Sequence, residues 1–108
     1  MTPSIELIFD RSCPHVDAAR DQLREALTRS GRAAAWTEWE RAAPNAPGYA
    51  QRYASPTVLV AGRDVAGVDP VDAGAGCRIY YDARGARVPA PTAHMIVGAL
   101  RAAEGVSE

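Results

Sequence analysis

The chain opens with a short apolar run that stops abruptly at polar turn residues. The members of this run are Ile5, Leu7, Ile8 and Phe9. Such a run is typical of a strand buried in the middle of a sheet. Residues 10–12 (Asp-Arg-Ser) break it, and Pro14 suits the first position of a helix because its missing N–H needs no partner there. The pattern predicts a strand over residues 5–9 and a helix that begins at about Pro14.

Apolar residues then recur at helical spacing as far as Ser30, and Gly31 is suited to end this helix. The apolar positions are Val16, Ala19, Leu23, Ala26 and Leu27. Residues 33–40 alternate around two tryptophans, which favours a second strand with Trp36 on its buried face and Trp39 at the surface.

The second half of the chain contains a short helical segment over residues 48–53, which we expect to bury Tyr49, Ala50 and Tyr53. Residues 58–60 predict a strand, and a hairpin turn at Gly62 and Arg63 follows it. Residues 77–81 predict an extra strand. Residues 92–103 predict a last helix, with Thr92 as its N-cap.

Length and composition predict one domain over residues 1–108, because such a chain is long enough for a single core. The net charge of −1 gives no electrostatic reason to expect a nucleic-acid or membrane partner. No signal peptide or membrane-spanning stretch is expected, and two cysteines are too few for a disulfide scaffold. We therefore expect a cytoplasmic protein with reduced thiols.

The first cysteine, Cys13, lies between the predicted strand and the predicted helix. Free N–H groups and the helix dipole at a helix N-terminus favour a thiolate over a thiol. We therefore interpret Cys13 as a reactive cysteine, and His15 as a candidate proton donor beside it. The other cysteine, Cys77, enters an apolar strand, which favours an inert core thiol.

Two segments carry a resemblance to a known fold. Cys13-Pro14 after an apolar strand, and residues 55–58 (Ser-Pro-Thr-Val) after a tyrosine-bearing helix, resemble the thioredoxin fold. Residues 62–69 are similar to glutaredoxins, except that Ala66 replaces the first glycine of a pair. The segments also resemble small thioredoxin-like proteins found beside mercury-resistance genes. The resemblance implies an α/β fold with a central mixed four-stranded sheet, flanking helices and an inserted extra strand around residues 77–81.

The resemblance also implies a site. The peptide bond between Ser55 and Pro56 is expected to be cis and to face Cys13, which leaves the Ser55 backbone available to a thiol-bearing substrate. The positions that match Gly67 and Asp69 help glutaredoxins to hold the γ-glutamyl end of glutathione.

One departure limits the chemistry: Val16 stands where thioredoxins have their second cysteine. What remains is monothiol exchange without a resident cofactor, in which Cys13 reacts with a small thiol or a protein disulfide and an external low-molecular-weight thiol acts as co-substrate. A second hypothesis is a thiophilic-metal protein that binds mercury on Cys13, shared with Cys77. A third is a non-enzymatic binding module on a thioredoxin scaffold.

Overall fold

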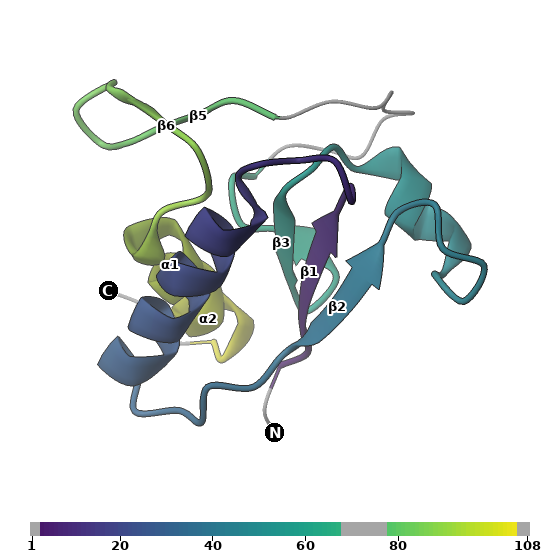
Figure 1. Ribbon diagram of the computed structural model, residues 1–108. Coiled ribbons are helices and arrows are strands. Elements are labelled where there is room, and N and C mark those ends of the chain that lie inside the picture. The colour runs from purple at the N-terminus through teal and green to yellow at the C-terminus, as the bar shows by residue number, and fades with distance from the viewer. Residues whose placement is uncertain (1–2, 68–77, 106–108) are drawn as a thin grey trace.

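The structure is a computed structural model that describes residues 3–67 and 78–105. It is an α/β fold, with two helices packed on one face of a four-stranded mixed sheet (Figure 1). The elements are β1 (Ile5–Phe9), α1 (Val16–Arg29), β2 (Thr37–Glu40), the 3₁₀ helix η1 (Gly48–Arg52), β3 (Thr57–Val60), β4 (Arg63–Asp64), β5 (Tyr80–Tyr81), β6 (Arg87–Val88) and α2 (Ala93–Ala103). The predicted α/β class and mixed four-stranded sheet are confirmed.

The sheet has the strand order β2-β1-β3-β4, with β1 parallel to β2 and antiparallel to β3. Ile8, near the carboxyl end of β1, pairs with Thr57, the first residue of β3. The loop that follows β1 and the residues that precede β3 therefore lie at the same edge of the sheet. This topology brings the Cys13 segment and the Ser55–Pro56 segment to one end of the molecule.

The main core lies between the sheet and the two helices. It contains the buried apolar residues Ile5, Leu7, Val16, Ala19, Leu23, Ala26, Leu27, Val58, Val60, Ile96 and Leu100. The helical periodicity of α1 predicted all five of its buried positions. The predicted N-cap of α2 is also confirmed, because Thr92 Oγ1 accepts a hydrogen bond from the Met95 N–H at 3.2 Å.

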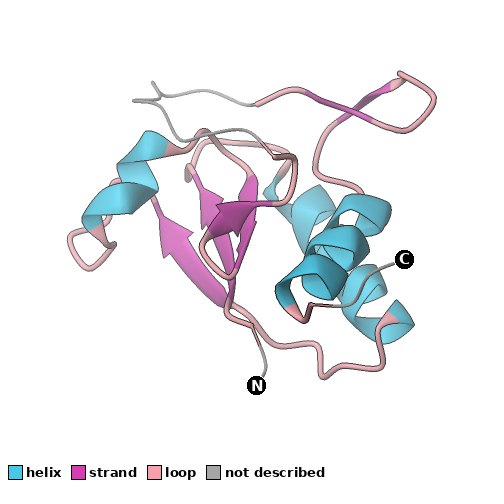
Figure 2. Ribbon diagram, turned by 180° about the vertical axis from the view of Figure 1, so that it is seen from behind, coloured by secondary structure: helices cyan, strands magenta, loops and turns pink. Residues whose placement is uncertain are grey.

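The opposite face of the sheet is covered by η1, seen from behind in Figure 2. Ala50 and Tyr53 are buried there against Ile8 and Leu59, as predicted. Tyr49 was expected in this core but is 42% exposed. Its hydroxyl donates to Glu6, and this hydrogen bond raises the pKa of Tyr49 to about 12.

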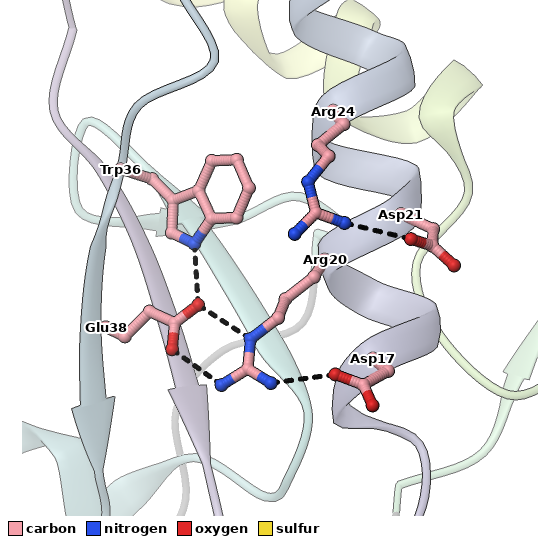
Figure 3. Close-up of polar contacts among 6 residues, drawn as sticks. All are labelled: Asp17, Arg20, Asp21, Arg24, Trp36 and Glu38. Atoms are coloured by element: carbon pink, nitrogen blue, oxygen red, sulfur yellow. Dashed lines mark hydrogen bonds and ion pairs between the residues drawn. The ribbon is translucent and has the colours of Figure 1, made fainter.

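The side chain of Arg20 joins α1 to β2 (Figure 3). Its Nε and Nη2 donate to the two carboxylate oxygens of Glu38 at 2.9 and 2.8 Å, and Trp36 Nε1 donates to the same carboxylate at 2.9 Å. These hydrogen bonds hold the pKa of Glu38 below its ordinary value. The hydrogen bond from Trp36 to Glu38, which also pairs with Arg20 of α1, accounts for the half-buried position of Trp36 beside α1. The strand itself begins at Thr37 and not, as predicted from the sequence, at residue 33.

Two further boundaries in the first part of the chain differ from the sequence prediction. The first helix begins at Val16 and not at Pro14, because residues 10–15 form turns. The hairpin turn between β3 and β4 is formed by Ala61 and Gly62, one residue earlier than expected. Both have positive φ values, 53° and 79°, as the tight turn of a two-residue hairpin requires.

The expected extra strand is part of a separate hairpin. Tyr80 and Tyr81 pair with Val88 and Arg87, and this two-stranded sheet projects beyond the N-terminal ends of the helices (Figure 1). The extra strand is therefore shorter than predicted, and residue 77 lies outside the described residues. In the described part of the chain, no helix has the length and apolar character needed to cross a membrane.

Candidate functional site

Cys13 lies in the loop between β1 and α1, and a hydrogen-bonded turn fixes its backbone. The carboxylate of Asp10 accepts from the Ser12 N–H at 3.1 Å and from the Ser12 hydroxyl at 2.9 Å. The Cys13 N–H donates to the Asp10 carbonyl at 3.0 Å. Cys13 itself is 9% exposed and packs with the main core.

This turn explains why the helix does not begin at Pro14. An aspartate that bonds the backbone two residues later forms a turn that competes with a helix start. Cys13 therefore lies three positions before the first helical residue, with His15 at the N-cap position. The predicted placement directly at the helix N-terminus is wrong.

A buried arginine anchors the turn to the sheet. Arg41 Nη1 lies 3.8 Å from the carboxylate of Asp10, and Arg41 Nη2 donates to the Gln51 carbonyl at 3.0 Å. The hydrogen bonds from Ser12, with the attraction of Arg41, lower the pKa of Asp10. Asp10 therefore stays ionised and keeps the turn closed at neutral pH.

The residues before β3 face the same edge of the sheet. The peptide bond between Ser55 and Pro56 is cis, the geometry that the resemblance implies. Ser55 is fully buried, and its hydroxyl has no hydrogen-bond partner among the described residues. Thr57 Oγ1 donates to the Ala54 carbonyl at 2.5 Å, which fixes the loop around Pro56.

The chain segment that leads into β5 covers this loop. The Arg78 N–H donates to the Ser55 carbonyl at 2.6 Å, and the Tyr80 hydroxyl donates to the Pro56 carbonyl at 2.5 Å. The Ser55 carbonyl, which we expected to be available to a substrate, therefore already accepts one hydrogen bond from the chain itself.

The guanidinium of Arg78 joins three elements. Its Nη1 lies 2.6 Å from Asp64 Oδ2 and donates to Thr57 Oγ1 at 3.1 Å. Its Cζ lies 4.5 Å from the centre of the Tyr80 ring, within the range of a cation–π contact. Asp64 is only 2% exposed in its side chain, so Arg78 compensates a buried charge.

Tyr80 links Cys13 to the proline loop. Burial is the main cause that raises the pKa of Tyr80, and the negative charge of a Cys13 thiolate raises this pKa further. The positive charge of Arg78 acts in the opposite direction. The Tyr80 hydroxyl therefore interacts electrostatically with Cys13 and Arg78 and is hydrogen-bonded to the Pro56 carbonyl, so this neighbourhood joins the thiol to the proline loop.

A cavity of about 440 Å³ opens beside this neighbourhood. Its lining residues are His15, Arg78, Ile79, Arg87, Val88 and Pro89. His15 is half-buried, makes no side-chain capping bond to α1, and lines the cavity. His15, the candidate proton donor two positions after Cys13, therefore lines a cavity beside the Cys13 turn.

Gly67 belongs to a different part of the surface. It has a φ of 75° and lines a second cavity between β4 and the last turns of α2, whose described lining includes neither Cys13 nor His15. Asp69 and Cys77 lie outside the described residues. The described residues contain no group of three or more potential metal ligands.

Sequence reasoning missed Arg78, Asp64 and Tyr80 as site residues. Arg78 and Asp64 are far apart in the chain, and each alone reads as an ordinary surface charge. A single aspartate in the second strand of a tight hairpin, beside buried valines, was the available signal. Only the structure shows that a cation from the β5 segment neutralises it.

The comparisons with known proteins identified no relative of this chain. No protein-family model matches the chain, and no curated protein or solved structure is significantly similar to it. The class that the structure defines is therefore the α/β class with a mixed four-stranded sheet.

Proposed function

We propose that this chain is a monothiol protein of thioredoxin-like fold that uses Cys13 in thiol–disulfide exchange. One observation carries the proposal: the Cys13 turn and the Ser55–Pro56 loop occupy the same edge of the sheet. Tyr80 supports it, because its hydroxyl bonds the Pro56 carbonyl while its pKa responds to the charge of Cys13.

The proposed reaction has two balanced steps. The Cys13 thiolate attacks one sulfur of a disulfide, its S–S bond breaks, a mixed disulfide forms on Cys13, and the other half leaves as a thiolate. The thiolate of an external low-molecular-weight thiol then attacks the substrate sulfur of the mixed disulfide, the bond to Cys13 breaks, a new disulfide of the external thiol and the substrate half leaves, and the Cys13 thiolate is regenerated. Val16 is buried where a resolving cysteine would stand, so the second step depends on the external thiol.

The experiment is an exchange assay with a small mixed disulfide and an excess of a monothiol. We expect wild type and Cys77→Ser to turn over and Cys13→Ser to be inactive. Intact-protein mass spectrometry, after acid quenching without the reducing thiol, should find one thiol adduct on wild type and on Cys77→Ser. If wild type neither turns over nor forms the adduct, exchange is wrong and the non-enzymatic binding module is favoured.

A further inference from the structure

The cavity beside Cys13 has a marked charge asymmetry. Its lining contains two arginines and a histidine, and no described aspartate or glutamate lines it. One of the arginines, Arg78, is neutralised by its ion pair with Asp64. The other, Arg87, is exposed on β6 and has no ion-pair partner within residues 3–67 and 78–105.

The remaining walls are apolar. Ile79 is 48% exposed although it is a large aliphatic residue, and Val88 and Pro89 continue the same surface. A volume of about 440 Å³ falls within the range of small-molecule sites, about 300–1,000 Å³. The lining therefore suits a small ligand with an aliphatic part and at least one anionic group.

The position of the cavity relates it to the thiol. His15 follows Cys13 by two positions, so their Cα atoms are at most about 7 Å apart. Arg78, which also lines the cavity, donates a hydrogen bond to the loop that precedes β3. The cavity therefore lies directly beside the Cys13 turn and the loop that precedes β3.

From these features we propose that the cavity is the substrate site for small disulfides that carry a carboxylate, with Arg87 as the residue that selects the anion. The inference rests on the proposed exchange function and names its substrate class. An extended protein chain that paired with Ser55 would share its carbonyl with the Arg78 N–H, whereas a small disulfide in the cavity needs no bond to this carbonyl.

The test compares three disulfides of similar size: dithiodipropionate with two carboxylates, neutral bis(hydroxyethyl) disulfide, and cystamine with two ammonium groups. Each rate with the protein is divided by the rate of a free monothiol with the same disulfide, which removes differences in intrinsic reactivity. We expect wild type to prefer dithiodipropionate, then the neutral disulfide, then cystamine. The preference should shrink at high salt, because exposed charges are screened.

Arg87→Gln should lower the preference for dithiodipropionate over the neutral disulfide about threefold, which is the scale of an exposed ion pair. Arg84→Gln is the matched control: it removes the same charge from the same hairpin at a position outside the cavity, and should leave the preference unchanged. Equal normalised rates for the three disulfides, or an Arg87→Gln variant that behaves as wild type, would overturn the inference.

A binding measurement separates this inference from the exchange function. Cys13→Ser removes the chemistry and keeps the cavity, so dithiodipropionate can be titrated into it by amide NMR. We expect shift changes at His15, Arg87 and Val88, and weaker binding when Arg87→Gln is added. If no disulfide reacts with wild type but these shifts appear, exchange fails and the anion site stands; if the shifts are absent, the site is wrong.

Discussion

Arg78 Nη1 lies 2.6 Å from Asp64 Oδ2, and this ion pair joins the segment before β5 to the edge strand of the main sheet. The side chain of Asp64 is 2% exposed and that of Arg78 is 16% exposed. Two adjacent hydrogen bonds, from the Arg78 N–H to Ser55 and from Tyr80 to Pro56, complete the attachment. The projecting hairpin is thus connected to the proline loop by a buried polar cluster.

Arg78→Gln should destabilise the protein by about 3–5 kcal/mol, because it leaves Asp64 as an uncompensated buried charge. The double variant Asp64→Asn/Arg78→Gln should cost less than the sum of the two single variants. Urea unfolding of the four proteins measures both quantities. Arg24→Gln is the control, since its pair with Asp21 is exposed and should contribute less than about 1 kcal/mol. Additive effects would show that Asp64 and Arg78 act independently.

The regular elements could be predicted because each repeats its own pattern. The apolar run of β1 and the helical spacing of α1 depend only on neighbouring residues, and the Thr92 cap depends on local hydrogen bonding. The start of α1 could not be predicted in this way. Asp10 satisfies the Ser12 N–H and forms a turn, which overrides the preference of Pro14 for a first helical position.

The candidate site was predicted only in the parts that follow from sheet topology. Cys13 and Pro56 lie at one edge because the strands that they flank are paired. The hydrogen bond from the Arg78 N–H to the Ser55 carbonyl depends on contact between segments that are distant in the chain, and no local pattern encodes such a contact. The same holds for His15, whose place on a cavity depends on where the β6 strand returns.

Glu38→Gln should destabilise the protein by about 1–2 kcal/mol at neutral pH, because Arg20 loses a charge-assisted pair that is less than a third exposed. The pKa of Glu38 in the folded protein lies below its ordinary value of 4.5. The stabilisation is therefore complete above 4.5 and is lost as the pH falls through the folded pKa. Urea unfolding at several pH values should show the difference from wild type shrinking in acid. Glu25→Gln, which removes an exposed helix pair with Arg29, should show little difference at any pH.

Tyr80→Phe should destabilise the protein by about 1–2 kcal/mol, because the buried Pro56 carbonyl loses its donor. The ring that lies against Arg78 is kept, so the effect isolates the hydroxyl. Thermal or urea unfolding measures it, and Tyr81→Phe is the matched control because Tyr81 is 56% exposed. Equal stability of the two variants would contradict a role for the Tyr80 hydroxyl in holding the proline loop.

The mercury hypothesis is tested through Cys77. A thiophilic ion such as mercury(II) prefers soft thiolate ligands, and a site of two thiolates needs both cysteines of this chain. Exchange with an external thiol needs only Cys13. Cys77→Ser should therefore keep disulfide exchange and weaken mercury binding, while Cys13→Ser should lose both activities. Mercury is titrated into the three proteins in competition with a small dithiol, with no other thiol present. Equal affinity of wild type and Cys77→Ser would exclude the shared site and leave Cys13 as the functional thiol.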